Sequence, residues 1–187
     1  YTIQNYLADQ ITVPRFSTEL PEFAEAEKAV QARIDHLMGI KGKKSVDSIH
    51  KELGHIMWEY VGMGRTEEGL KTALKLLKDI RKEFETNLFI PGSTEGVNIE
   101  LEKALRLNDF ITMGELIAYD ALNRNESCGG HFREEYQTEE GEAKRDDENY
   151  FYVSCWEYQG SDDVAPVLYK EPLVYEAIKV QTRNYKS

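Results

Sequence analysis

Long apolar runs and excess basic charge are missing from this chain, and cysteines are few. No run approaches the roughly 20 apolar residues of a membrane span, and no secretory signal segment is present. Two cysteines, Cys128 and Cys155, are too few for a disulfide framework, which favours a reducing, cytoplasmic compartment. The 23 basic and 34 acidic residues leave a formal net charge of -11, which would repel nucleic-acid phosphates and anionic lipid. We therefore expect no nucleic-acid partner and no direct membrane insertion.

The usual sequence signs of a catalytic or metal centre are also missing. No G-x-G-x-x-G follows a predicted strand, and no phosphate-binding P-loop is present. His50 and His55 are five residues apart on a predicted helix, so they do not share a face as metal ligands at i and i+4 would. The carboxylates of residues 134–149 lack EF-hand spacing and predict a solvated acidic loop. We predict no catalytic, cofactor-binding or metal-ligating residue.

Apolar residues recur at three- and four-residue spacing in segments that predict helices. The first twenty residues show no sustained period and are expected to be a lead-in; the sequence "YTIQNYLADQ", which opens on Tyr1, is typical of the middle of a protein. Ser45 and Thr66 are the predicted N-caps of the second and third helices. The expected helices are residues 21–40, 45–64, 65–87 and 97–125.

Each predicted helix has an apolar face, and the last one has two. In the first helix the face contains Phe23, Ala26, Val30, Ile34 and Leu37. The two stripes of the last helix are Val97, Leu101, Ala104 and Leu105, and then Leu107, Phe110, Ile111, Gly114, Ile117, Ala118 and Ala121. A helix that is apolar on two sides is packed on two sides. We therefore expect an exposed patch over Leu107, Phe110 and Ile117 if part of the natural cover is missing, and self-association through it.

The character of the chain changes after Asn125. Residues 150–160 are aromatic and β-branched and alternate like a strand, and residues 167–180 suggest a second strand or an extended arm. The predicted fold class is mainly α, an up-down bundle of three to four helices with an irregular C-terminal tail that contains a small β element. The expected division is 1–44 for the lead-in and first helix, 45–126 for the bundle, and 127–187 for the turn, acidic loop and tail.

The stretch "NESCGGHFREEYQ" at residues 125–137 is the richest in chemical groups. A reactive thiolate at Cys128 beside His131 would be disfavoured by the neighbouring glutamates, so a thiol enzyme ranks last. The pair Gly129–Gly130 predicts a helix end with positive φ. Arg133 and His131 are expected to bind carboxylates or helix-end carbonyls and to fix the outgoing chain. We predict a structural turn that docks the bundle on another domain, formed by Ser127, Cys128, Gly129, Gly130, His131 and Arg133.

Three segments together resemble one known domain. Residues 49–74, "IHKELGHIMWEYVGMGRTEEGLKTAL", residues 98–136, which end in "NRNESCGGHFREEY", and residues 145–156, "RDDENYFYVSCW", are similar to the C-terminal helical domain of the flavoprotein subunit of succinate dehydrogenase and fumarate reductase. The similarity in order and spacing runs over roughly residues 45–185. Many relatives have Arg at the position of Cys128, which indicates a divergent branch in which Arg124 or Arg133 compensates.

The resemblance implies a function for a larger protein. Members of this family interconvert succinate and fumarate with a covalently held FAD, and exchange electrons with an iron–sulfur subunit and a membrane quinone site. Their catalytic and flavin-linking residues lie upstream, so none is carried over here. The implied partners are the FAD-binding domain of the same chain, for which residues 1–44 would be the lead-in, and the iron–sulfur subunit. The implied location is the cytoplasmic face of the inner membrane, and the chain itself would hold no cofactor.

Other readings stay open. L-aspartate oxidase and adenylylsulfate reductase have related helical domains. The alternative from another class is an independent acidic helical adaptor that recruits a basic protein partner through the charge of -11.

Overall fold

A computed structural model describes residues 2–11, 16–160 and 164–181, and most of their regular structure is helical. The elements, in chain order, are α1 (Thr2–Gln10), α2 (Pro21–Gly39), β1 (Lys44–Ser45), α3 (Val46–Tyr60), α4 (Glu67–Asn87), β2 (Leu88–Phe89), α5 (Ile99–Asn123), α6 (Asp147–Tyr150), β3 (Tyr152–Glu157) and β4 (Val167–Pro172). The predicted fold class, a helical bundle followed by a tail with a small β element, is confirmed.

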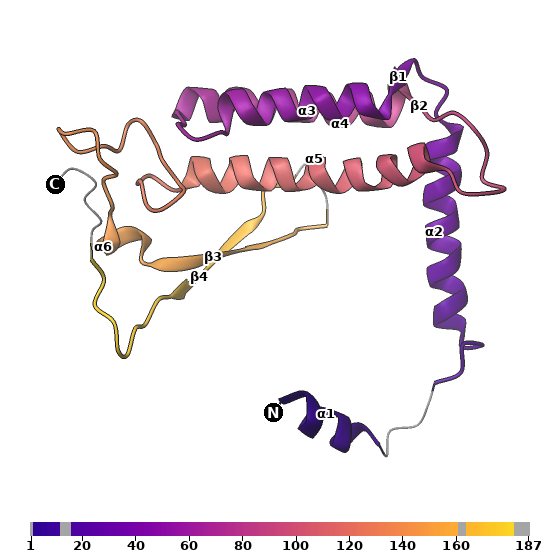
Figure 1. Cartoon of the computed structure of the whole chain (residues 1–187), viewed down its shortest axis with the longest axis horizontal. Coiled ribbons are helices and arrows are strands. Elements are labelled where there is room, and N and C mark those ends of the chain that lie inside the picture. Colours follow the sequence, from indigo (N-terminus) through magenta and orange to yellow (C-terminus); the bar gives the residue numbers. More distant parts are fainter. Residues whose placement is uncertain (1, 12–15, 161–163, 182–187) are drawn as a thin grey trace.

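Helices α3, α4 and α5 lie side by side and form the bundle (Figure 1). Their apolar faces meet in one core, in which Ile49, Leu70, Leu77, Leu107 and Ile111 are at most 1% exposed. Burial of each such side chain contributes about 1.5–3 kcal/mol. The parallel bridge of β1 with β2 ties the start of α3 to the end of α4.

The predicted caps of α3 and α4 are present. The side-chain oxygen of Ser45 accepts from the amide of Ser48 at 3.2 Å, and that of Thr66 accepts from Gly69 at 3.0 Å. Such caps contribute about 1 kcal/mol each, because they satisfy amides that have no partner within the helix. Asn98 caps α5 in the same way, so Val97 lies before the helix and is 99% exposed, which makes its predicted place in an apolar stripe wrong.

Helix α5 packs on one broad face rather than two complete ones. Its buried residues are Ala104, Leu107, Ile111, Gly114, Ala118 and Ala121, and all of them except Gly114 belong to the core that also contains the buried residues of α3 and α4. A Cβ at Gly114 would lie 3.2 Å from the sulfur of Met57, so the absence of a side chain permits this close approach. Phe110 and Ile117 are 45% and 42% exposed, whereas Leu107 is buried and cannot belong to a surface patch.

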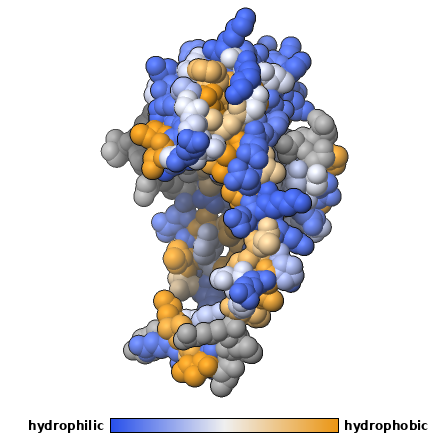
Figure 2. All heavy atoms as spheres, turned by 90° about the vertical axis from the view of Figure 1, so that its right-hand side faces the viewer, coloured by the Kyte–Doolittle hydropathy of each residue, from blue (hydrophilic) through white to orange (hydrophobic). Residues whose placement is uncertain are grey.

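The N-terminal helices stand apart from the core. Helix α1, which replaces part of the expected lead-in, has no buried residue. Helix α2 occupies the predicted segment, but Leu37 is its only buried residue, while Phe23 and Val30 are 50% and 59% exposed. The predicted stripe is therefore not a core face in this chain, because only the C-terminal end of α2 reaches the bundle, while its N-terminal part extends away from it (Figure 1). Seen from the α2 side, separate patches of apolar surface lie among hydrophilic ones on the narrow part of the molecule below the bundle (Figure 2).

The tail contains the predicted strands as an antiparallel hairpin. Strand β3 pairs with β4 from Tyr152↔Pro172 to Glu157↔Val167, and its side chains alternate between half-buried and exposed. The indole Nε1 of Trp156 donates to the carboxylate of Asp120 at 2.7 Å and thereby attaches the hairpin to α5. The short α6 lies within a segment expected to be loop. Among the described helices, none has the length and hydropathy of a membrane span.

Candidate functional site

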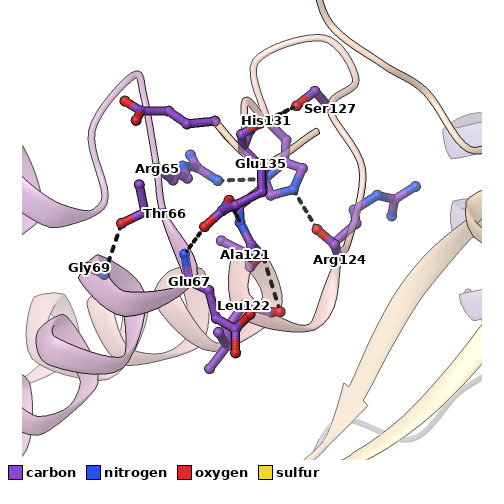
Figure 3. Close-up of polar contacts among 12 residues, drawn as sticks. Arg65, Thr66, Glu67, Gly69, Ala121, Leu122, Arg124, Ser127, His131 and Glu135 are labelled. Carbon is purple, nitrogen blue, oxygen red and sulfur yellow. Dashed lines mark hydrogen bonds and ion pairs between the residues drawn. The ribbon is translucent and has the colours of Figure 1, made fainter. Parts of the chain in front are cut away.

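The loop that follows α5 is fastened to the turn between α3 and α4. The amide of Arg65 donates to the carbonyl of Phe132 at 3.1 Å, and the amide of Glu134 donates to the carbonyl of Arg65 at 2.8 Å. These bonds form a parallel bridge between Arg65 and Arg133. Backbone pairing across a sequence distance of more than sixty residues thus places the loop over the end of the bundle (Figure 3).

A tight turn at the glycine pair shapes this loop. The amide of Cys128 donates to the carbonyl of His131 at 2.8 Å, and the amide of His131 donates back to Cys128 at 3.0 Å. Gly129 adopts the expected positive φ, at +60°, a conformation that a Cβ would strain. The prediction that the pair ends the helix is wrong, because α5 ends at Asn123 and the turn closes a small hairpin further on.

A buried arginine, rather than a glycine, ends α5. Arg133 is fully buried, and its Nη1 donates to the carbonyls of Ala121 and Leu122 at 3.0 and 3.3 Å. A cation at this position complements the negative end of the helix dipole and satisfies carbonyls that lack helical partners. Its Nε donates to the Glu135 carboxylate at 3.1 Å. That carboxylate also accepts from the amide of Glu67 at the start of α4.

Ser127 holds the backbone of that arginine. The Ser127 hydroxyl accepts from the Arg133 amide at 2.8 Å and donates to the Arg133 carbonyl at 3.1 Å. Ser127 is fully buried, so both bonds are shielded from water. The Nη2 atom of Arg133 is buried and has no hydrogen-bond partner within the described residues.

His131 joins two elements through its two ring nitrogens. Nδ1 lies 2.8 Å from Arg65 Nη1, and Nε2 lies 2.9 Å from the carbonyl oxygen of Arg124 (Figure 3). A guanidinium can only donate, so Nδ1 accepts and Nε2 carries the hydrogen, which makes the ring neutral. Burial lowers the pKa of His131, and the charges of Arg65, Arg133 and Arg124 lower it further, against the opposing effect of the Arg124 carbonyl.

Arg124 extends the cluster to the tail. Its Nε donates to the buried Glu126 at 2.8 Å, and its Nη2 donates to the Tyr150 carbonyl at 2.6 Å. The same guanidinium lies over the rings of Tyr150 and Tyr152, 5.7 and 5.4 Å from their centres. The other oxygen of Glu126 accepts from the Asp146 amide at 2.9 Å. The end of α5, α6 and the β hairpin are therefore held by one arginine–glutamate pair.

His131 cannot act as a base for Cys128 in this arrangement. Both nitrogens of His131 are engaged with Arg65 and Arg124, so the ring has no free lone pair to take a proton from Cys128. The described residues contain no group of three His, Cys, Asp or Glu side chains that could hold a metal ion. A cavity of about 460 Å³ beside the cluster is open and polar, with Asn123, Tyr136, Tyr150 and Lys170 in its wall. What the arrangement does is fasten three segments together.

The structure brings together the six residues predicted from the sequence, in one loop of residues 127–133. It also shows partners that sequence reasoning missed, of which Arg65 is the main one. The available signal was its position in the turn between α3 and α4, where its Nε donates to the carbonyls of Val61 and Gly62, just past the end of α3, at 3.1 and 3.3 Å. The docking role of the loop stays a prediction.

Comparison with known proteins places this chain beside flavoproteins. The family described as "Fumarate reductase flavoprotein C-term" matches residues 50–185. An uncharacterized FAD-dependent oxidoreductase of Methanocaldococcus jannaschii is 31% identical over 112 residues, which is 60% of this chain and 20% of that protein. The fumarate reductase flavoprotein subunit of Proteus vulgaris is 29% identical over 148 residues, 77% of this chain and 24% of the subunit.

A solved structure has the same fold. A quinol–fumarate reductase with menaquinol molecules superposes with a TM-score of 0.71 at 24% identity, over 90% of this chain and 28% of the matched chain. At that identity the likeness shows the fold alone. The chain thus spans between about a fifth and somewhat more than a quarter of the length of these relatives.

Proposed function

Because the chain belongs to the family of fumarate reductase flavoprotein C-terminal domains, we propose that it is the helical domain of a flavin-dependent oxidoreductase that interconverts succinate and fumarate. In this proposal the domain contributes scaffold and docking surface, while FAD and the reacting groups belong to another part of the larger protein. The observation that carries the proposal is the family match over residues 50–185. Within the family, the reactions of L-aspartate oxidase and adenylylsulfate reductase are the alternatives.

Uncovered apolar surface supports a docking role. Single exposed apolar side chains are ordinary, but groups of them on neighbouring helices mark interaction surfaces. On α5, more than a third of the surface of Phe110, Met113, Leu116 and Ile117 is exposed, and α1 and α2 carry further exposed apolar residues: Ile3, Tyr6, Leu7, Phe23 and Val30. An isolated helix as short as α1 is marginal in water. We infer that a larger body covers this surface.

The partners and location follow from the same proposal. The body would be the FAD-binding domain of the same protein, and the assembly would include an iron–sulfur subunit that passes electrons to or from a quinone at the cytoplasmic face of the inner membrane. The buried cluster around Arg133 would then keep the end of the bundle rigid, so that docking does not have to order it first.

Charge insertion on the apolar face of α5 tests the docking role. In the complete gene product we expect Met113→Glu with Ile117→Glu to reduce flavin retention and fumarate reduction at least tenfold, because a docked surface cannot hydrate the new carboxylates. Both side chains are about half exposed in this chain, so the same changes should leave the 187-residue chain folded by circular dichroism. Lys78→Glu, on the outward face of α4, is the matched control and should change neither flavin retention nor fumarate reduction. Unchanged flavin content and activity in the double variant would contradict the proposal.

The independent acidic adaptor is the alternative from a different class, supported by the net charge of -11. It predicts salt-sensitive binding of a basic protein by the chain alone, with no flavoprotein body in the same gene product. The family match favours the first proposal over this one.

A further inference from the structure

His131 occupies a junction between two loops that have few other side-chain links. On one side is Arg65, in the turn between α3 and α4, and on the other is the carbonyl of Arg124 at the end of α5. The ring is about half buried and donates through one nitrogen while it accepts through the other. The side-chain link that the ring makes between the two elements therefore depends on one specific protonation state of His131.

A second proton on the ring cannot be accommodated in this arrangement. It would occupy Nδ1, the atom that accepts from Arg65 Nη1 at 2.8 Å, and so two donors would face one another. The hydrogen bond to Arg65 would be lost and a second positive charge would be placed beside the guanidinium. The bond from Nε2 to the Arg124 carbonyl can survive, because that nitrogen donates in both protonation states.

The charged groups around the ring do not offset the new charge. The cations that act on it are Arg65, Arg124 and Arg133. The nearby carboxylates have other partners: Glu126 binds Arg124, Glu135 binds Arg133 and the Glu67 amide, and Asp120 accepts from Trp156. Glu134 lies over Gly64, and the remaining titratable group of the loop is the thiol of Cys128. No carboxylate within the described residues makes a hydrogen bond to His131.

We propose that His131 is an acid-sensitive clasp, which holds the loop of residues 124–135 against the α3–α4 turn when the ring is neutral and releases it when Nδ1 is protonated. The Gly129–Gly130 turn can serve as the hinge, because Gly129 already has a positive φ. The part that would open is the backbone bridge between Arg65 and the loop, because it lies directly beside the bond that protonation breaks. This device belongs to the chain itself and does not depend on the proposed function.

The direction of the pH effect follows from linkage. A histidine that stays neutral in the folded state prefers its charged form in the open state, so the clasp is fully closed above the ordinary histidine pKa of about 6.5. As the pH falls from that value toward the lowered pKa of the closed state, the ratio of closed to open loop decreases by about tenfold per pH unit. Below the lowered pKa of the closed state, the ratio of closed to open loop becomes constant again.

Nuclear magnetic resonance on the whole 187-residue chain tests the clasp between pH 8 and pH 5. We expect the His131 ring to show the Nε2–H tautomer and to titrate below about 6.5. Over the same pH range, hydrogen-exchange protection of the Arg65 and Glu134 amides, corrected for the intrinsic pH dependence of exchange, should decrease. Protection that stays constant while His131 titrates, or titration of His131 at or above 6.5, would overturn the proposal.

Two variants separate the clasp from general loss of stability. His131→Phe should abolish the pH-dependent step at both amides, and persistence of the step would show that another group causes it. Arg65→Gln, which removes one facing cation, should move the His131 midpoint and the exchange step upward together; a step that fails to follow the midpoint also counts against the clasp. His55 is exposed and provides the control, since His55→Gln should leave both the His131 midpoint and the exchange step unchanged.

Discussion

Arg133→Met would remove the guanidinium that ends α5 and leave an apolar side chain as long as the arginine stem in its place. In the native chain Arg133 is fully buried and bonds the carbonyls of Ala121 and Leu122, together with the carboxylate of Glu135. Methionine fills the space of the arginine stem but offers no donor. The variant therefore tests whether the helix end depends on this cation.

The expected size of the effect is a balance of two changes. Two helix-end carbonyls lose a charged donor, at a cost of about 1.5–3 kcal/mol each before relaxation. Loss of the buried, unpartnered Nη2 atom offsets about 1–3 kcal/mol of this. When the lower ends and the upper ends of the two ranges are paired, the net destabilisation is about 2–3 kcal/mol, which for a chain of this size corresponds to a decrease in Tm of about 4–12 °C.

Urea denaturation followed by far-ultraviolet circular dichroism measures the change directly. The matched control is Arg106→Met, whose guanidinium binds Glu102 one turn earlier on α5, a pair in which both side chains are more than half exposed. A pair of this kind contributes about 0–1 kcal/mol, so the control should unfold close to the native chain. If Arg133→Met also lies within about 0.5 kcal/mol of the native chain, the assignment of Arg133 as the end of α5 is refuted.

Two further variants and one labelling experiment test other parts of the structure. A Cβ at Gly42 would lie 1.9 Å from the carbonyl carbon of Asn87, whereas a Cβ at Gly39 would meet nothing within 4 Å. Gly42→Ala should therefore lower the free energy of unfolding in urea by at least about 2 kcal/mol, and Gly39→Ala by less than about 1 kcal/mol. Equal unfolding midpoints for the two variants would contradict the close approach of Gly42 to Asn87. Cys155 is exposed and Cys128 is partly buried, so maleimide should label Cys155 faster; faster labelling of Cys128 would indicate an activated thiol.

Local signals account for the parts of the fold that the sequence predicted. Ser45 and Thr66 are recognisable as caps because each bonds an amide three residues along the chain. Apolar spacing predicted α3 and α4, and alternation predicted the β hairpin. Helix α1 was missed even though Ile3, Tyr6 and Leu7 have helical spacing, because the segment is short and a nearby proline suggested irregular chain.

The remainder depends on contacts between distant residues. Periodicity identifies the apolar face of α2, but it does not show that Phe23 and Val30 lie beyond the reach of the bundle. The same limit applies to the candidate site: the loop residues 127–133 were found from their composition, but Arg65 binds His131 across 66 positions of sequence. The glycine pair was interpreted as a helix end because glycine is common at such ends. The carbonyls at the actual end of α5 are instead bonded by Arg133, ten residues beyond Asn123, which local sequence does not reveal.

The central claim is that this chain braces a flavin-carrying body and performs no redox chemistry alone. The most direct test is an absorption spectrum of the purified 187-residue chain after incubation with FAD and gel filtration, followed by an assay of fumarate reduction with a reduced dye as electron donor. The account predicts no flavin absorbance in the protein peak and no turnover above the rate without protein. Flavin that co-elutes with the chain, or measurable reduction of fumarate by it, would contradict the account.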